Sequence, residues 1–447
     1  MCLIFQVKPS GLIFSALKYL WRKQMVMLFL ENISLRRFHT FATEAKARYY
    51  LEFSSSDELR EMWKARPGLF SQVLVMGGGS NLLFTGDYPG MVIRPAVTGI
   101  ALEKEDDRHV WLRAGAGVVW DDFVSFAVDA GWGGVENLSL IPGMVGAVPV
   151  QNIGAYGCEA ASVISSVTGV EFPSGEIRDY DASSCRFAYR SSVFKEQLRE
   201  KFIITSVVFR LDKTPQLKLE YGELKMEVMK KFKGSKASPF KGPGVVDVAG
   251  VGEEGKEESG SQYPISHIQS EEVNDEGAYD SGFGAPLKTK DLRLKTSSEI
   301  ENAATVQMVR EAVIGIRRGK LPDPALLGNA GSFFKNPVVR KEAAEKLKAA
   351  FPGMPLYPAG ETAAHGSGEE RMKLSAGWLI DQCGWKGFRR GDAGVHRDHA
   401  LVLVNYGDAS GMEIYSLSEE IRFSVWERFG VELEREVMVI GPAGVIQ

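Results

Sequence analysis

The segment 233–300 constrains the fold of this chain more than any other feature, because a compact domain cannot enclose it. The segment is rich in Gly, Ser, Glu, Asp and Lys, and it contains the runs GEEGKEESGS and SEEVNDEGAYDSGFG. Such a composition buries too little apolar surface to offset the entropy that is lost on ordering. We therefore predict a disordered insertion, a solvated linker, with folded parts on both sides of it.

The rest of the chain has the composition of a globular protein. Hydrophobic residues make up 44% and charged residues 25% of the 447 residues, and the length suggests two or three domains. Strand-like and helix-like runs follow one another irregularly, which indicates an α+β fold rather than repeated βαβ units. We expect strands at 47–53, 73–76, 91–94, 110–114, 400–405 and 437–440, and helices at 55–63, 120–130, 298–318, 372–382 and 413–429.

The first residues, 1–27, resemble nothing in the domain that follows. The apolar run 11–30 is interrupted at 18 and at 22–24 by charged and amide side chains, so it does not predict a helix that spans a membrane. It also lacks the small-residue cleavage site of a secretory signal. We interpret 1–27 either as an amphipathic extension or, preferably, as sequence upstream of a true start at Met25 or Met27.

Charge and cysteine usage exclude some classes of function. A net charge of −4 does not indicate a surface for polyanions, so we expect no nucleic-acid partner. The four cysteines are scattered without CxxC spacing, which is typical of free thiols in a reducing compartment such as the cytoplasm. His396 and His399, with Cys383 nearby, lack a fourth ligand, so we expect no metal site.

Two glycine-rich loops are candidates for binding phosphate. GGGSN at 77–81 follows a short apolar strand, so its backbone N–H groups could hold an anion. The loop is not a P-loop, and Leu82 stands where a dinucleotide-binding fingerprint has its last glycine. The second loop, 141–157, is long enough to wrap an extended ligand such as a pyrophosphate, although an ornate structural turn is the alternative.

A third segment, GNAGSFFKNP at 328–337, places Ser332 among residues that favour a tight turn. The Asn-Pro pair at its end stops regular structure. The segment therefore either presents the Ser332 hydroxyl to a ligand or forms an ordinary surface turn, and its own residues do not decide between the two.

Taken in order along the chain, these segments resemble the family of UDP-N-acetylenolpyruvoylglucosamine reductases. The similarity runs from about Leu30 to Gly441, without the insertion. The motifs that carry it are GGGSNLL at 77–83, IPGMVGAVPVQNIGAYG at 141–157, YRSSVFK at 189–195, KLPDP at 320–324, GNAGSFFKNP at 328–337, SAGWLIDQ at 375–382 and Glu436-Val437. The resemblance implies an FAD-binding domain of the vanillyl-alcohol-oxidase/PCMH type with two subdomains at 28–228. A C-terminal α/β substrate domain would follow at 301–441.

The resemblance also implies a cytoplasmic enzyme of peptidoglycan precursor synthesis without an obligate protein partner. In that family NADPH reduces non-covalently bound FAD. Hydride then passes to the methylene carbon of UDP-N-acetylglucosamine enolpyruvate, which yields UDP-N-acetylmuramate. Negative charge develops on the α carbon and its carboxylate, so fixed positive charge and a positioned acid are the chemical requirements.

The family's catalytic residues correspond to Arg190, Ser332 and Glu436. Arg190 would hold the developing charge with its guanidinium fork, Ser332 would give the proton to the α carbon, and Glu436 would hydrogen-bond the charge directly or through water. Without the motifs, a surface salt bridge for Arg190 and an exposed C-terminal carboxylate for Glu436 are the ordinary alternatives. Arg190, Ser332 and Glu436 are far apart in sequence, so their assignment to one site rests on the resemblance.

Further residues are assigned by the same correspondence. The expected cofactor contacts are Gly77, Gly78, Gly79, Ser80, Asn81, Gly143, Gly146, Gln151, Asn152 and Gly154. The expected substrate contacts are Tyr156, Tyr189, Tyr221, Lys320, Asn336, Tyr357 and Lys386, among which Tyr357 occupies the place of a tyrosine loop found in one class of the family.

The chain departs from the family pattern at two positions. His399 stands where glutamine is frequent, and Met438 stands where some members have arginine. Two alternative functions remain: another flavoenzyme on the same scaffold, such as an oxidase of small alcohols or lactones, and a degenerate, non-catalytic reductase.

Overall fold

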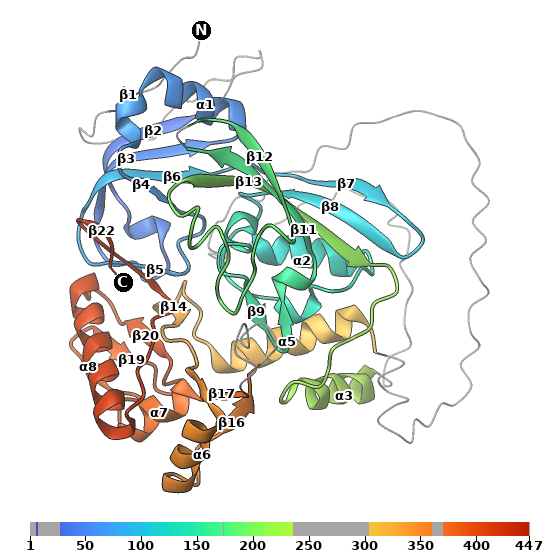
Figure 1. Ribbon diagram of the computed structural model, residues 1–447, viewed down its shortest axis with the longest axis vertical. Coiled ribbons are helices and arrows are strands. Elements are labelled where there is room, and N and C mark those ends of the chain that lie inside the picture. The colour runs from blue at the N-terminus through green and yellow to red at the C-terminus, as the bar shows by residue number, and fades with distance from the viewer. Residues whose placement is uncertain (1–5, 8–26, 173, 236–303, 360–369, 447) are drawn as a thin grey trace, which may run out of the picture.

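The computed structural model describes residues 6–7, 27–172, 174–235, 304–359 and 370–446, arranged in three lobes (Figure 1). The extension predicted at 1–27 and the insertion predicted at 233–300 lie almost wholly outside these residues. Within the described part, residues 233–235 complete helix α3 (Leu224–Ser235). No helix among the described residues is both long and apolar enough to cross a membrane.

The first lobe (residues 6–7 and 27–95) is built on a five-stranded mixed sheet in the order β1-β2-β3-β6-β4. Its central strands pair in parallel, and β2 joins β3 antiparallel. Helix α1 (Ser56–Ala65) covers it and begins at Ser55, whose hydroxyl accepts from the Glu58 N–H, a typical N-cap. The strands are β1 (Gln6–Val7), β2 (Leu28–Ser34), β3 (Lys46–Phe53), β4 (Val73–Val75) and β6 (Tyr88–Pro95).

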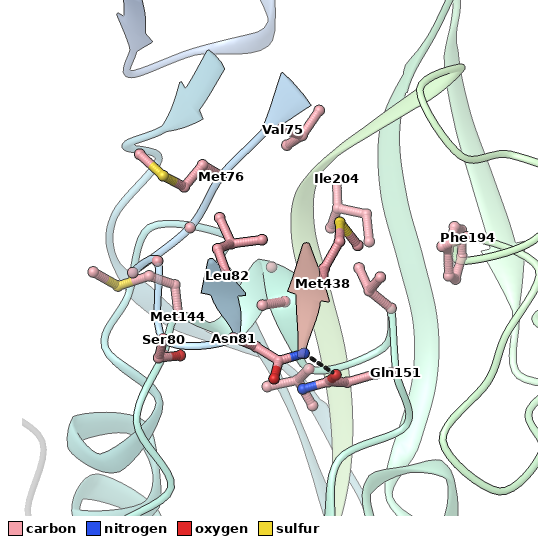
Figure 2. A pocket seen from close by; sticks show the side chains of 18 of the residues that line it. Val75, Met76, Ser80, Asn81, Leu82, Met144, Gln151, Phe194, Ile204 and Met438 are labelled. Atoms are coloured by element: carbon pink, nitrogen blue, oxygen red, sulfur yellow. Dashed lines mark hydrogen bonds between the residues drawn. The ribbon is translucent and has the colours of Figure 1, made fainter. Parts of the chain in front are cut away.

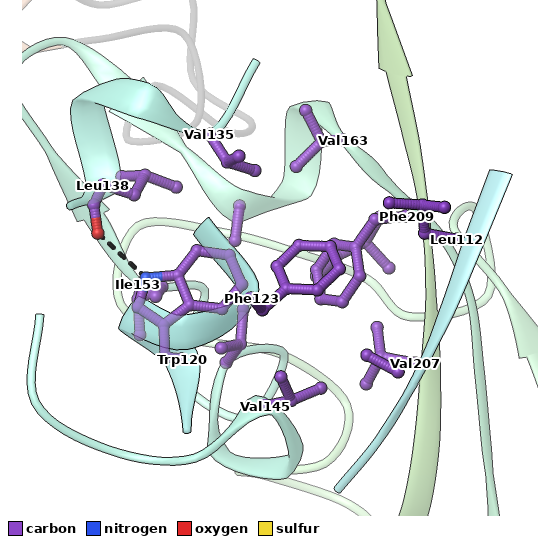
Figure 3. Packing of buried hydrophobic residues seen from close by; sticks show 14 of the residues in the cluster. Leu112, Trp120, Phe123, Val135, Leu138, Val145, Ile153, Val163, Val207 and Phe209 are labelled. Carbon is purple, nitrogen blue, oxygen red and sulfur yellow. Dashed lines mark hydrogen bonds between the residues drawn. The ribbon is translucent and has the colours of Figure 1, made fainter. Parts of the chain in front are cut away.

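The middle lobe is built on an antiparallel sheet in the order β12-β11-β13-β8-β7. Helix α2 (Trp120–Asp129) packs on it through Trp120 and Phe123, whose rings meet Phe209 of β13 (Figure 3). The Trp120 Nε1–H donates to the Leu138 carbonyl at 2.9 Å, so this buried ring has its polar atom satisfied. The strands are β7 (Ile100–Glu105), β8 (His109–Gly115), β11 (Ile164–Glu171), β12 (Ile177–Asp181) and β13 (Phe202–Asp212), and the small pair β9 (Gly154–Ala155) and β10 (Cys158–Glu159) lies within the second glycine loop.

Helix α5 (Val306–Lys320) packs against the middle lobe. It shares a buried apolar cluster with α3, and Arg310 forms two hydrogen bonds, of 2.7 and 3.0 Å, with the Asp121 carboxylate of α2. Our division of the sequence placed this helix in the C-terminal domain that begins at 301. The packing groups α5 with the middle lobe instead, because its apolar face is complementary to α3.

In its described residues, 328–359 and 370–446, the C-terminal lobe combines two small antiparallel sheets with helices α6, α7 and α8. One sheet has the order β14-β20-β19-β18 and the other β15-β17-β16. The elements are β14 (Gly328–Ser332), β15 (Val338–Arg340), α6 (Lys341–Ala350), β16 (Leu356–Pro358), β17 (Arg371–Leu374), α7 (Ala376–Gln382), β18 (Arg389–Arg390), β19 (Ala393–Val395), β20 (Val402–Asn405) and α8 (Gly411–Phe429).

The end of the chain returns to the first lobe. Strand β21 (Met438–Gly441) pairs in parallel with β5 (Leu82–Phe84), so that Met438 lies opposite Leu82, and β22 (Gly444–Ile446) completes this three-stranded sheet. The pairing attaches the segment before β21, which includes Glu436, to the segment just after the first glycine loop.

Most predicted elements are confirmed, with two corrections. The helix predicted at 372–382 is wrong in its first part, because residues 371–374 form β17, paired on both sides, and α7 begins only after its N-cap Ser375. The tight turn predicted at Ser332 is also wrong: Ser332 ends strand β14. The register slips between Asn329 and Ser332, where Gly331 has φ +69°, so the predicted irregularity takes the form of a β-bulge.

Candidate active site

A cleft lies where the two glycine loops meet the middle sheet (Figure 2). The loops 77–81 and 141–151 form adjoining parts of its wall. Apolar side chains from all three lobes line the remainder, including Met76, Leu82, Phe194, Ile204 and Met438. Apolar walls suit a flat ring system, and a row of glycine N–H groups suits phosphate.

Two glycines let the two loops pack closely against each other in the wall of this cleft. A Cβ atom on Gly78 would lie 3.3 Å from the Gly143 Cα, and one on Gly143 would lie 3.1 Å from the Ser80 hydroxyl oxygen. Gly143 also has φ +133°, which side chains avoid. The two loops therefore pack backbone against backbone, and this part of the cleft wall has no side chain at Gly78 or Gly143.

Two other glycines of these loops are required because they pack against other segments of the protein. A Cβ atom on Gly79 would come 2.2 Å from the Phe38 carbonyl oxygen, and one on Gly146 would come 2.7 Å from the Ala116 Cβ. Both residues line the cleft, yet their lack of a side chain is explained by the protein alone.

Polar side chains connect the two loops by hydrogen bonds. The Ser80 hydroxyl donates to the Pro142 carbonyl at 2.9 Å. The Asn81 amide donates both to Gln151 Oε1 at 2.8 Å (Figure 2) and to the Glu436 carbonyl at 3.1 Å. Asn81 thus connects the cleft with the segment that carries the predicted catalytic glutamate.

Two residues predicted at the cofactor lie behind the cleft. The buried Asn152 side chain donates to Glu159 and to the Ala188 carbonyl, and it accepts from the Ala161 N–H. The Gly154 carbonyl accepts from Arg190 Nη2 at 2.9 Å. Neither residue lines the cleft, whereas the other predicted cofactor residues do: Gly77, Gly78, Gly79, Ser80, Asn81, Gly143, Gly146 and Gln151. Asn152 and Gly154 support Arg190 rather than the cleft wall.

Arg190 and Glu436, which are distant in sequence, form an ion pair. Arg190 Nε lies 2.9 Å from Glu436 Oε1, and both side chains are largely buried. The N–H of that buried Nε does not point at the oxygen, so it makes no aligned hydrogen bond within the described residues. A buried guanidinium donor without an aligned acceptor is suited to a carboxylate or oxyanion of a ligand.

Ser332 precedes a residue that contacts the Glu436 backbone. Its neighbour Phe333 accepts the Glu436 N–H through its carbonyl at 2.8 Å, and Phe334 forms a bridge with Arg435. Ser332 itself is half-buried and lies opposite Val402 of β20. Backbone contacts of Phe333 and Phe334, which follow β14, with residues 435–436 therefore bring the end of β14 close to the segment that carries Glu436.

Tyr189 and a lysine that sequence reasoning missed flank Arg190. The Lys373 ammonium lies 4.3 Å from the centre of the Tyr189 ring, and the Arg190 guanidinium lies 5.7 Å from it. Burial raises the pKa of Tyr189, while burial and the Arg190 charge lower the pKa of Lys373. Nothing in the local sequence RMKLSA distinguishes Lys373 from any strand lysine.

A second group of predicted residues gathers around Tyr156. Its ring meets the Tyr221 ring edge-on at 6.2 Å, and burial raises the pKa of Tyr156. Lys320 pairs with Glu223 at the same face. Sequence reasoning missed the largely buried Arg317, which donates to the Leu140 carbonyl at 3.1 Å and whose pKa burial lowers. The available sequence signal was that Arg317 precedes Lys320 by three residues on a helix, a spacing that places two side chains side by side.

The remaining predicted contacts have different surroundings. Asn336 uses its side-chain oxygen to accept the Ala376 N–H, at the start of α7. Lys386 pairs with Asp381 at 2.6 Å on the C-terminal lobe. Tyr357 is 52% exposed and lies on β16 opposite Lys373, rather than on a loop within the described residues. Their roles at a ligand stay predictions.

His399 has an unusual environment for a histidine. Its Nδ1 is buried and makes no hydrogen bond among the described residues. Burial, followed by the charges of His396 and Lys320, lowers its pKa. The imidazole is therefore held neutral near the Lys320 end of the site, at the position where the sequence departs from the expected glutamine.

Comparisons with known proteins agree with this architecture. A model described as "FAD binding domain" matches residues 47–181, and one described as "UDP-N-acetylenolpyruvoylglucosamine reductase, C-terminal domain" matches residues 323–440. The predicted fold class, an FAD-binding domain followed by a reductase C-terminal domain, is confirmed, and the glycine cradle and apolar walls of the cleft fit the cofactor FAD.

Full-length relatives extend the match. The UDP-N-acetylenolpyruvoylglucosamine reductase of Pseudomonas fluorescens is 38% identical over 405 residues, which cover 91% of this chain and 97% of the relative. That of Flavobacterium johnsoniae is 37% identical over 410 residues, 92% of this chain and 98% of the relative. The crystal structure of the enzyme from Thermus caldophilus has the same fold, with a TM-score of 0.51, 21% identity and coverage of 93% of this chain and 99% of that one. The chain therefore belongs to the UDP-N-acetylenolpyruvoylglucosamine reductase family.

Proposed function

We propose that this chain reduces UDP-N-acetylglucosamine enolpyruvate to UDP-N-acetylmuramate in the cytoplasm, with NADPH as reductant and non-covalently bound FAD as carrier. The observation that carries the proposal is the Arg190–Glu436 pair. The pair leaves a buried guanidinium N–H without an aligned acceptor, and Asn81, which lines the cleft that fits FAD, holds the Glu436 backbone by a hydrogen bond.

Binding of the cofactor would fall to the two glycine loops. The backbone of 77–81 and Gly143 would face its pyrophosphate, and the apolar wall with Phe194 and Ile204 would pack on its ring system. FAD, when bound, supplies hydride from NADPH to the methylene carbon of the substrate.

Arg190 would hold the enolpyruvyl carboxylate. Its Nη2 is fixed by the Gly154 carbonyl at 2.9 Å, which leaves Nε facing the space near Glu436. As hydride arrives, charge spreads from the α carbon onto the carboxylate, and a preorganised guanidinium stabilises this charge without reorganising. Glu436 would orient Arg190 and hydrogen-bond the charged carboxylate when protonated or through water.

Ser332 would complete the reduction by protonating the α carbon. A serine hydroxyl is a weak acid, but the carbanion-like carbon is a strong base, so the transfer is downhill once the two are in contact. The atoms balance: hydride and one proton convert the enolpyruvyl C=C bond into the lactyl ether. Solvent then restores the serine proton.

The UDP part of the substrate would lie toward Tyr156, Tyr221 and Lys320. The edge-on tyrosine pair offers apolar and hydrogen-bonding surface, and the basic side chains Lys320 and Arg317 offer charge to a diphosphate. Tyr357 would close over this part from β16, as in the class of the family with a tyrosine loop.

The decisive experiment measures NADPH oxidation by the purified holoenzyme. Bound flavin should be bleached by NADPH under anaerobic conditions, and its colour should return when UDP-N-acetylglucosamine enolpyruvate is added. Flavin that is reoxidised only by oxygen, with no response to the enolpyruvyl substrate, would refute the proposal and favour the oxidase alternative. Protein that binds no flavin would favour the non-catalytic alternative.

A further inference from the structure

Lys195 lies between the FAD cleft and the Arg190–Glu436 pair. Its side chain lines the cleft next to Phe194, and its Nζ donates to the Arg190 carbonyl at 2.9 Å. Lys195 thus contacts the predicted catalytic arginine through the arginine's backbone rather than through its side chain.

The backbone of Arg190 needs such support. Arg190 has φ +55°, a left-handed conformation that side chains other than glycine rarely adopt. A tight turn encloses it, with reciprocal backbone hydrogen bonds of 3.0 and 3.1 Å between Ala188 and Ser191. Conformations of this kind persist only where surrounding contacts hold them, and they concentrate at functional sites. Lys195 supplies the contact to the carbonyl of the strained residue itself.

The surroundings of Lys195 are unusual for a lysine. Burial, followed by the charge of Lys335, lowers its pKa, while Glu436, Glu196 and Glu434 oppose this effect. An aliphatic side chain would fill the same space without desolvating a charge. The buried ammonium group instead donates a hydrogen bond to the Arg190 carbonyl, which offsets part of its desolvation.

We infer that Lys195 is a positioning residue for Arg190: by holding the left-handed Arg190 backbone, it directs the guanidinium at Glu436 and at the carboxylate of the substrate. The inference rests on the proposed function. Because Lys195 acts through Arg190, it should matter for the half-reaction in which substrate accepts hydride and not for the half-reaction in which NADPH reduces flavin.

Stopped-flow measurement of the two half-reactions on holoenzyme tests the inference. Lys195→Met keeps the aliphatic stem and removes the donor. We expect it to slow reoxidation of reduced flavin by UDP-N-acetylglucosamine enolpyruvate roughly 10- to 100-fold, as for displaced supporting groups. Reduction by NADPH, measured on enzyme loaded fully with FAD, should change far less. Lys195→Arg, which keeps a donor, should restore part of the rate.

A control variant and a double variant show whether the effect is specific to Lys195 and Arg190. Lys213→Met is the matched control, because Lys213 pairs with Glu105 at 2.6 Å on the remote β7–β8 side of the middle sheet, and it should leave both half-reactions unchanged. In an Arg190→Lys background, Lys195→Met should add little, since both changes act on one group.

Several results would overturn the inference. These are a Lys195→Met enzyme that reoxidises at the wild-type rate, an equal loss in both half-reactions, and full additivity with Arg190→Lys. If wild-type enzyme is reduced by NADPH but never reoxidised by the enolpyruvyl substrate, the proposed function fails and this inference fails with it. A defect that appears only in the variants therefore distinguishes the inference about Lys195 from the proposed function itself.

Discussion

The Asn81 side chain donates a hydrogen bond of 3.1 Å to the carbonyl oxygen of Glu436, across 355 positions of sequence. The same amide group donates to Gln151 in the second glycine loop at 2.8 Å. One side chain therefore joins both glycine loops to the segment that carries the predicted catalytic carboxylate. The positions of the loops and of that segment are coupled by this contact, because neither loop can shift without straining it.

Replacement of Ser332 separates proton donation from the rest of the reaction. Ser332→Ala should slow reoxidation of reduced flavin by the enolpyruvyl substrate by about 10²–10⁴-fold, the usual range for a lost general acid. NADPH should still reduce the flavin normally, because Ser332 takes no part in that step. Rapid-mixing spectroscopy of both half-reactions checks this, and substrate turnover at the wild-type rate would show that another group is the acid.

The approach of Gly78 to Gly143 predicts a selective effect on cofactor binding. Gly78→Ala places a methyl group 3.3 Å from the Gly143 Cα, on the wall of the cleft, and should weaken FAD binding more than it lowers stability. Gly315→Ala is the control, since nothing lies within 4 Å of its Cβ position within helix α5. That variant should bind FAD normally and gain roughly 0.5–1 kcal/mol in stability.

Fluorescence titration of the apoenzymes with FAD measures the two dissociation constants. Equal affinities for the Gly78→Ala and Gly315→Ala enzymes would mean that the contact between the glycine loops does not shape the cofactor site.

The Arg310–Asp121 pair should hold α5 on the middle lobe. Burial raises the pKa of Asp121, but the hydrogen bonds from Arg310 and from the Leu140 N–H outweigh this effect, so the net shift is downward. A carboxylate with a lowered pKa stabilises the fold above its unfolded pKa of about 3.9 and loses that contribution as the pH falls. Asp121→Asn should therefore lower the free energy of unfolding by about 3 kcal/mol at pH 7, with a smaller difference once the pH falls below about 3.9.

Urea denaturation at several pH values measures this difference. Asp129→Asn, at the exposed end of the same helix, should change stability little at any pH. A loss for Asp121→Asn that is independent of pH would contradict the linkage argument.

His39 predicts acid sensitivity in the first lobe. It is buried beside Phe84, its Nε2 contacts the Thr43 carbonyl at 3.0 Å, and burial lowers its pKa to about 4. The unfolded chain takes up the histidine proton near pH 6.5, whereas the folded chain does so only near pH 4. Stability is therefore complete above pH 6.5 and falls as the pH decreases toward 4, by about 3 kcal/mol.

Thermal or urea unfolding of wild type and His39→Gln between pH 4 and 7 checks this prediction. The variant should show a flatter pH dependence over that interval, because its amide does not titrate. Parallel curves for the two proteins would assign the acid sensitivity to other groups.

Local elements could be predicted from sequence because neighbouring residues decide them. Helix α8 was expected at 413–429 and is observed at Gly411–Phe429, with a capping box of Ser410 and Glu413 at its start. The glycine loops were expected from composition and are observed lining the cleft. Strand β17 was missed. It pairs on both sides with β15 and β16, and the local sequence of β17 does not indicate these partners.

The sequence by itself determined where the chain can turn tightly, which segments are helical, and which family motifs it carries, because these properties depend on residues close together along the chain. Only the tertiary structure decided that Glu436 meets Arg190 at 2.9 Å, that β21 pairs with β5, and that α5 packs on the middle lobe. These contacts join segments that are distant in sequence, so they exist only once the lobes have packed and the entropy of closing long loops has been overcome.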